Sequence, residues 1–216
     1  MAQLFPRWAD TALRAILLGA GALLVGVPLG LLAFARTPVA TGQYASVPQP
    51  VPFSHPLHVN GFHIDCRYCH AGAERGPMAG LPPTSACVPC HAQGWLNSSP
   101  FAAVRRSVAT QRPIPWRRVT AVPDFVFFNH AVHVRKGVGC ETCHGRVDLM
   151  QQVYQTAPLT MNWCLDCHRE PERFLRPVEQ VTAMGWAPGE SQLAQGRALA
   201  ARYNVRRLTT CTACHR

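Results

Sequence analysis

The chain has 216 residues, a formal net charge of +10 and 19 prolines, and its length predicts one domain or two small ones. The proline content is well above average usage, so we expect few long helices or strands between residues 37 and 185. A basic chain could bind nucleic acid or an anionic membrane. However, the sequence holds no nucleic-acid motif and its aromatic residues do not alternate with basic ones, which argues against nucleic-acid binding.

The first predicted element is a membrane anchor over residues 1–36. Residues 15–35 read AILLGAGALLVGVPLGLLAFA, a stretch without charge that is long enough to cross a bilayer as a helix. Arg7 and Arg14 precede it and favour a cytoplasmic N-terminus. The alternative is a signal peptide cleaved after Ala35, but a signal peptide's apolar region usually has only about 7–15 residues. We therefore expect an uncleaved single-pass anchor.

Residues 37–52 are rich in proline and small residues, and we expect them to form a linker between the anchor and the rest of the chain. Residues 53–216 then form the predicted main domain.

The motif C-x-x-C-H occurs five times and uses all ten cysteines. It is typical of covalent haem c attachment, in which two thioether bonds hold the porphyrin and the histidine becomes the proximal iron ligand. A zinc knuckle or a redox dithiol would not require the adjacent histidine. We therefore predict five haems c, attached to Cys66 and Cys69, Cys87 and Cys90, Cys140 and Cys143, Cys164 and Cys167, and Cys211 and Cys214, with proximal ligands His70, His91, His144, His168 and His215.

Two further histidine pairs form a repeat ahead of these motifs. FSHPLH begins at Phe53 and FNHAVH begins at Phe128, each upstream of two haem motifs. The repeat predicts two dihaem modules, about residues 53–91 and 128–168, with the fifth haem at 211–215. Four of the remaining histidines are the predicted distal ligands: His55, His58, His130 and His133.

The distal ligand of the fifth iron has two main candidates. Met161 lies three residues before Cys164, and His63 lies three residues before Cys66. Either could close the last iron, and we lean to Met161, since His63 has no counterpart in the second module. A His/Met pair would raise that haem's potential relative to a bis-histidine pair. Methionine is more often a core filler, so three others are weaker candidates: Met78, Met150 and Met184.

The expected fold is a multihaem cytochrome c with class III-like modules, in which short helices and irregular loops surround stacked haems. The haem faces would replace a side-chain core, and the haem propionates would offset part of the positive charge. One better helix is expected near the end, where Ala194, Ala198, Ala201 and Val205 share a helical face that would pack against the domain.

Several long strings resemble the pentahaem cytochrome c subunit of alternative complex III, a bacterial quinol:electron-acceptor oxidoreductase. They are FSHPLHVNGFHIDCRYCH at 53–70, PDFVFFNHAVHVRKGVGCETCHGRVD at 123–148, APLTMNWCLDCHREPE at 157–172 and YNVRRLTTCTACHR at 203–216. The family often has a histidine shortly after W-x-R-V, where this chain has Thr120. The resemblance implies an iron–sulfur subunit, multi-span quinol-binding membrane subunits and a monohaem cytochrome c as partners.

Three functions follow from these observations. The first is a non-catalytic electron-transfer subunit of a respiratory or photosynthetic quinol-oxidising complex. It would be anchored in the inner membrane, with its haem domain on the periplasmic side, where haem c is attached. The second is a stand-alone anchored quinol dehydrogenase that feeds a periplasmic reductase. The third, a multihaem oxyanion reductase, needs an open iron, which the number of candidate ligands argues against. The sequence leaves open which distal ligand serves which haem, the order of potentials, quinol contact and the final acceptor.

Overall fold

The computed structural model describes residues 4–92, 94, 97–189 and 191–215. The chain forms two compact units, one up to Gly42 and one from Gln43 onwards. Within the described residues, β-pairing is confined to four isolated bridges, and the regular elements are otherwise helical. This confirms the predicted fold class of short helices with one long N-terminal helix.

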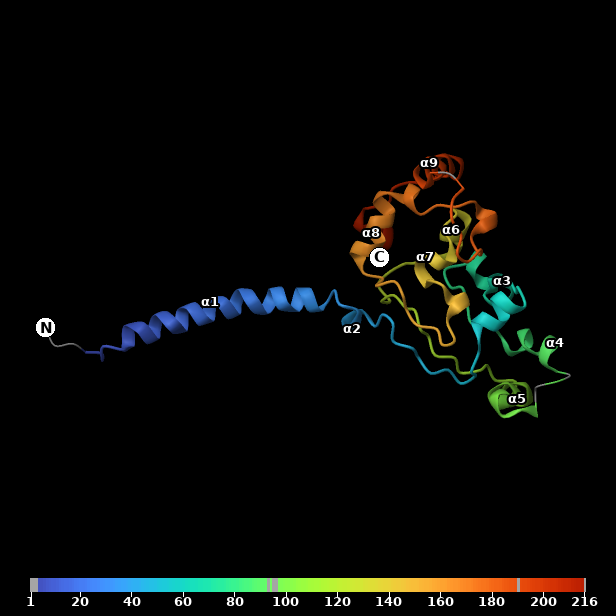
Figure 1. The fold of residues 1–216 in the computed structure, drawn as a ribbon, viewed down its shortest axis with the longest axis horizontal. Helices are drawn as coiled ribbons and strands as arrows, with labels where there is room; N and C mark the ends of the chain where they lie inside the picture. The colour runs from blue at the N-terminus through green and yellow to red at the C-terminus, as the bar shows by residue number, and fades with distance from the viewer. Residues whose placement is uncertain (1–3, 93, 95–96, 190, 216) are drawn as a thin grey trace. The chain divides into compact units, whose positions relative to one another are not determined.

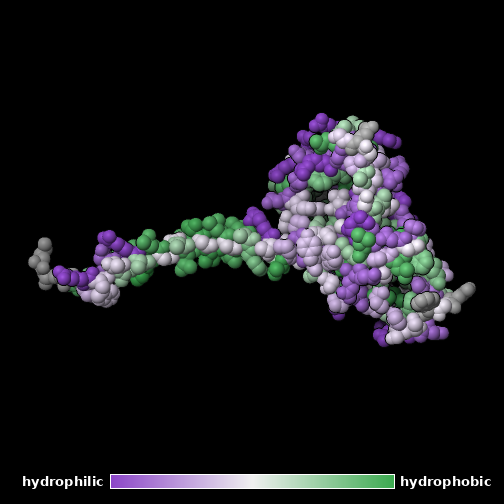
Figure 2. Space-filling view, viewed as in Figure 1, coloured by the Kyte–Doolittle hydropathy of each residue, from purple (hydrophilic) through white to green (hydrophobic). Residues whose placement is uncertain are grey.

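The first unit is built on α1, Ala9–Phe34, in which no residue is buried. Its first turn carries Asp10, which pairs with Arg14 at 2.9 Å in an i, i+4 arrangement that favours a helix. Figure 2 shows the apolar side chains that cover this helix. Its length and composition suit a membrane span or a signal sequence. A short helix, α2 (Pro38–Thr41), follows and ends at Gly42 in the left-handed conformation.

The second unit begins inside the segment that we predicted as a linker. The backbone N–H of Tyr44 donates to the carbonyl of Gln155 at 2.8 Å. The Gln49 side chain donates to the Arg117 carbonyl at 2.8 Å and accepts from the Arg117 N–H at 2.9 Å. The predicted linker is therefore divided at Gly42, and its second part packs on the larger unit.

The larger unit consists of short helices joined by loops, with α4 and α5 at one end and α8 and α9 at the other (Figure 1). The α-helices are α3 (Cys66–Cys69), α4 (Val88–His91), α5 (Ala102–Thr110), α6 (His130–Arg135), α7 (Cys140–His144), α8 (Met161–Arg169), α9 (Gln192–Arg202) and α10 (Cys211–Cys214). The π-helix η1 covers Pro56–Gly61, and the 3₁₀ turns are η2 (Ala71–Glu74), η3 (Thr84–Ala86), η5 (Ser99–Phe101), η6 (Val147–Leu149), η7 (Pro171–Arg173) and η8 (Val178–Gln180).

The side-chain core of this unit is small. Its main cluster joins Val51, Val104 and Ile114, with partly buried neighbours that include Phe101 and Trp116. Other buried apolar side chains are scattered among the described residues, whereas many large apolar side chains are exposed. A unit with so few buried side chains needs additional apolar surface to be stable.

The predicted late helix is confirmed as α9, but its predicted packing face is wrong. Gly196 and Leu199 are buried, while Ala194, Ala198 and Ala201 are exposed. The reason is a close backbone approach, because a Cβ atom at Gly196 would lie 1.8 Å from the Glu172 carbonyl oxygen in η7. The glycine, and not the alanine stripe, therefore determines which face of α9 packs against η7.

Candidate haem-binding sites

The first histidine pair is arranged around one phenylalanine. Phe53 stacks on His58 with ring centroids 4.2 Å apart, and it meets His55 edge-on at 4.8 Å. The Nδ1–H of His58 donates to the carbonyl of Ser54 at 2.8 Å. A carbonyl can only accept, so this bond assigns the proton to Nδ1 and leaves the Nε2 lone pair free for a metal.

The second pair repeats this geometry closely. Phe128 stacks on His133 at 4.5 Å and meets His130 edge-on at 4.6 Å. The Nδ1–H of His133 donates to the carbonyl of Asn129 at 2.8 Å, the same four-residue step as in the first pair. Two segments that resemble each other in sequence thus orient their imidazoles in the same way.

Three further rings are oriented through Nδ1 by backbone carbonyls. His70 donates to Gly80 at 2.9 Å, His130 to Pro77 at 2.8 Å and His215 to Phe125 at 3.3 Å. Such bonds fix the tautomer and the ring plane of a metal ligand.

Three predicted distal histidines lie opposite predicted proximal ones. The ring-centroid distances are 6.2 Å for His58 and His91, 6.3 Å for His130 and His144, and 6.1 Å for His133 and His168. Two imidazoles on opposite sides of one metal, with metal–nitrogen bonds of about 2.0–2.1 Å, would have centroids roughly 6.3 Å apart. The residues present therefore fit three irons that each have two histidine ligands.

His55 is the fourth predicted distal ligand. Its Nδ1 is buried without a hydrogen-bond partner among the described residues. Burial first, and then the neighbouring His70 and His58, lower the pKa of His55 to about 4. Burial first, and then His130 and His70, likewise lower the pKa of His144 to about 4. Both rings are therefore neutral at pH 7, which is the form that binds a metal.

The fifth motif lies beside the segment that precedes the second histidine pair. The backbone N–H of Phe127 donates to the Cys214 carbonyl at 2.8 Å, and the rings of Phe125 and His215 are 5.8 Å apart. Burial first, and then the nearby Cys214, raise the pKa of the Cys164 thiol. The fourth and fifth motifs are therefore neighbours in space.

The described contacts bring neither Met161 nor His63 to His215. Met161 is 64% exposed at the start of α8, three residues from Cys164 and so on the same helical face. His63 has a φ of +53° and, of the ten histidines, all within the described part of the chain, it alone is exposed. Of the weaker candidates, Met150 is buried, Met78 is exposed and Met184 is partly buried.

The remaining motif contacts connect the other sites. A hydrogen bond between the thiols of Cys66 and Cys140 raises the pKa of Cys140. Burial first, and then the neighbouring Cys87, raise the pKa of Cys69. Burial first, and then Cys167, raise the pKa of Cys143. The first motif is thus next to both the second and the third, and the third is next to the fourth.

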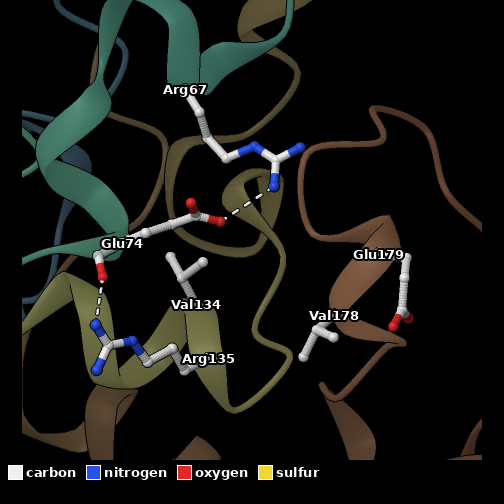
Figure 3. Close-up of a pocket in the computed structure, with 6 residues that line it drawn as sticks. All are labelled: Arg67, Glu74, Val134, Arg135, Val178 and Glu179. Atoms are coloured by element: carbon white, nitrogen blue, oxygen red, sulfur yellow. Dashed lines mark hydrogen bonds and ion pairs between the residues drawn. The ribbon is translucent and has the colours of Figure 1, made fainter.

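The two predicted modules contact each other beside a cavity of about 350 Å³, whose lining residues are drawn in Figure 3. Arg67, inside the first motif, pairs with Glu74 at 3.1 Å. Arg135, at the end of α6, donates to the Glu74 carbonyl at 2.8 Å, and Ala131 in the same helix donates to Gly76 at 3.1 Å. The turn η2 therefore connects the first haem motif to the helix that carries the second histidine pair.

Comparison with known proteins finds similarity to multihaem cytochromes c. Residues 126–216 match the family described as "Cytochrome c7 and related cytochrome c". Over 103 residues the chain is 40% identical to "Menaquinone reductase, multiheme cytochrome c subunit" from Nitratidesulfovibrio vulgaris strain Hildenborough. That match covers 47% of this chain and 48% of the relative, so the two proteins correspond over about half their lengths. Residues 126–216 therefore resemble multihaem cytochromes c of the cytochrome c7 type, whose haem c is covalently bound.

Proposed function

We propose that this chain is the electron-transfer subunit of a membrane-bound quinol-oxidising complex and relays electrons through five haems c to a periplasmic acceptor. The observation that carries the proposal is the set of three histidine pairs with centroids 6.1–6.3 Å apart. A haem iron whose two axial positions are both held by protein ligands has no open position for a substrate. Such an iron suits electron transfer and not reduction of an oxyanion.

The haems would supply one-electron chemistry when bound, and the protein would fix their order. In this proposal His55, His58, His130 and His133 are the distal ligands opposite His70, His91, His144 and His168. The contacts between motifs support a spatial order of second, first, third, fourth and fifth haem. Such a row would begin near α4 and end near α10.

The partners come from similarity. The resemblance to alternative complex III suggests an iron–sulfur subunit, multi-span quinol-binding subunits and a monohaem cytochrome c, with the haem domain on the periplasmic side of the inner membrane. The relative is named as a subunit of a menaquinone reductase. That name also supports a quinone as the redox partner, but with electrons flowing to the quinone and not from a quinol. An electron-transfer subunit of a quinone-reducing complex is therefore the second candidate function.

The first test measures quinol oxidation. The purified chain should accept electrons from a chemical reductant but oxidise a menaquinol analogue at less than about a tenth of the rate of the complete membrane complex, because the quinol site would lie on other subunits. Equal rates for the isolated chain and the complex would contradict the proposal and support a stand-alone quinol dehydrogenase.

The haem count can be checked by mass spectrometry of the intact protein. All ten cysteines belong to C-x-x-C-H motifs, so we expect five covalent haems and no thiol that reacts with iodoacetamide. A fully matured protein with four haems or fewer, or with a reactive thiol, would contradict this count. The double variant with Cys211→Ala and Cys214→Ala should lack one haem, and its mass calibrates the haem count.

Membrane attachment is a separate expectation. Because α1 carries no charged residue after Arg14, the mature protein should stay in the membrane fraction after a wash with 1 M salt, about the concentration at which surface electrostatics are screened. N-terminal sequencing should detect residues ahead of α1. A mature protein that begins at Arg36 and is released by the wash would identify residues 1–35 as a signal peptide.

A further inference from the structure

The third haem motif contains a carboxylate that pairs with a buried arginine. Glu141 lies between Cys140 and Cys143, and its Oε1 accepts from Nη2 of Arg176 at 2.8 Å. The side chains of Arg176 and Glu141 are only 6% and 13% exposed. In this respect the pair differs from the other ion pairs described in this chain, each of which has an arginine that is at least 44% exposed.

Both members of the pair are held by further contacts. The second oxygen of Glu141 accepts from the backbone N–H of Gly185 at 2.6 Å. The Nη1 of Arg176 donates to the Ala183 carbonyl at 2.9 Å, and the guanidinium lies 4.8 Å from the ring centroid of Trp186. If the pair separated into water, Arg176 would lose its contacts with Ala183 and Trp186, and Glu141 would lose its hydrogen bond from Gly185.

The backbone around Arg176 also holds the start of α7. The N–H of Cys140 donates to the Val181 carbonyl at 2.9 Å, and the N–H of Arg176 donates to the Gly137 carbonyl at 2.8 Å. A Cβ atom at Gly139 would lie 2.2 Å from the Arg176 guanidinium carbon, so only a glycine allows this approach. Residues 175–186 thus fix both the first residue and the first turn of the third haem motif.

We propose that Arg176 and Glu141 are positioning residues that hold the third haem attachment site and keep its local field neutral, and thereby set that haem's reduction potential. This rests on the proposed function, in which Cys140 and Cys143 carry a haem. Two opposite charges that touch largely cancel at a distance, whereas either charge alone in a buried site acts through a low dielectric. The pair would therefore matter most when one member is removed.

The test is a haem-resolved redox titration of the full-length holoprotein in detergent, run at about pH 9 so that a carboxylate without its partner stays ionised. The third haem is assigned from His130→Ala, which removes its proposed distal ligand. Arg176→Met should lower that haem's potential and Glu141→Gln should raise it. We expect each change to be about tenfold in the equilibrium constant for reduction, or about 59 mV for one electron. The double variant should return the potential close to that of the wild type.

The chain offers a matched control in its fourth motif. Asp166 lies between Cys164 and Cys167 and pairs with Arg173 at 3.2 Å, but these two side chains are 57% and 45% exposed. Solvent screens that pair, so Arg173→Met should shift the fourth haem's potential by much less. If Arg176→Met does not mature, two other variants test the proposal. Glu141→Gln should raise the third haem's potential, and the charge-conserving Arg176→Lys should leave that potential nearly unchanged.

The outcomes separate this inference from the proposed function. Single variants that shift the third haem's potential in the same direction, or that leave it unchanged while five haems are present, would overturn the role of the pair and leave the function intact. A wild-type protein without a haem on Cys140 and Cys143 would overturn the haem assignment itself.

Discussion

Replacing His133 with alanine should convert one low-spin haem into a high-spin haem while the number of attached haems stays at five. His133 is partly buried, its Nδ1–H is held by the Asn129 carbonyl at 2.8 Å, and its ring centroid lies 6.1 Å from that of His168. Alanine offers no ligand, so the fourth iron would become five-coordinate. Its attachment to Cys164 and Cys167 is not affected, which is why the haem count should not change.

Optical and EPR spectra measure the spin state, and a pyridine haemochrome assay measures the haem count. Val132→Ala is the matched control, because Val132 lies in the same helix and its side chain is 51% exposed. Added imidazole should restore the low-spin spectrum of His133→Ala by occupying the free position. Unchanged low-spin spectra in His133→Ala would remove His133 from the set of ligands.

Local capping explains why short helices form at two of the attachment motifs. Asp65 caps the first motif helix through its side chain, and Thr160 caps α8 in the same way. Such caps precede helices for a local reason, since their oxygens accept from backbone N–H groups that the helix leaves free. The repeated Phe-x-His-x-x-His spacing was equally informative, because a four-residue step from the carbonyl of Ser54 or Asn129 sets the tautomer of His58 or His133.

Long-range polar contacts could not be predicted in this way. The two hydrogen bonds between Gln49 and Arg117 join residues 68 positions apart, and nothing in a proline-rich segment indicates such a partner. The pair of Arg176 and Glu141 spans 35 positions and follows neither helical nor strand spacing. Hydrophobic periodicity reports which residues face an interior, and it carries no information about which charged residues will meet.

The partner of His215 is the remaining question about the ligands, and the structure adds one argument to the sequence. Met161 and Cys164 are three residues apart in α8, so they share a helical face. The Cys164 thiol is close enough to Cys214 for the second thiol to influence its pKa, after burial. The face of α8 that carries Met161 is thus the one near the fifth haem motif, whereas His63 precedes α3 at the first motif.

If Met161 closes the fifth iron, Met161→His should lower one reduction potential, on the order of 0.1 V, because a thioether favours the ferrous state more than an imidazole does. The wild-type oxidised protein should show the weak near-infrared sulfur-to-iron band of His/Met ligation, and Met161→His should remove it. His63→Ala is the comparison variant and should change neither the band nor the potential. If the wild type lacks the band and His63→Ala produces a high-spin haem, then His63 is the fifth distal ligand and all ten histidines bind iron.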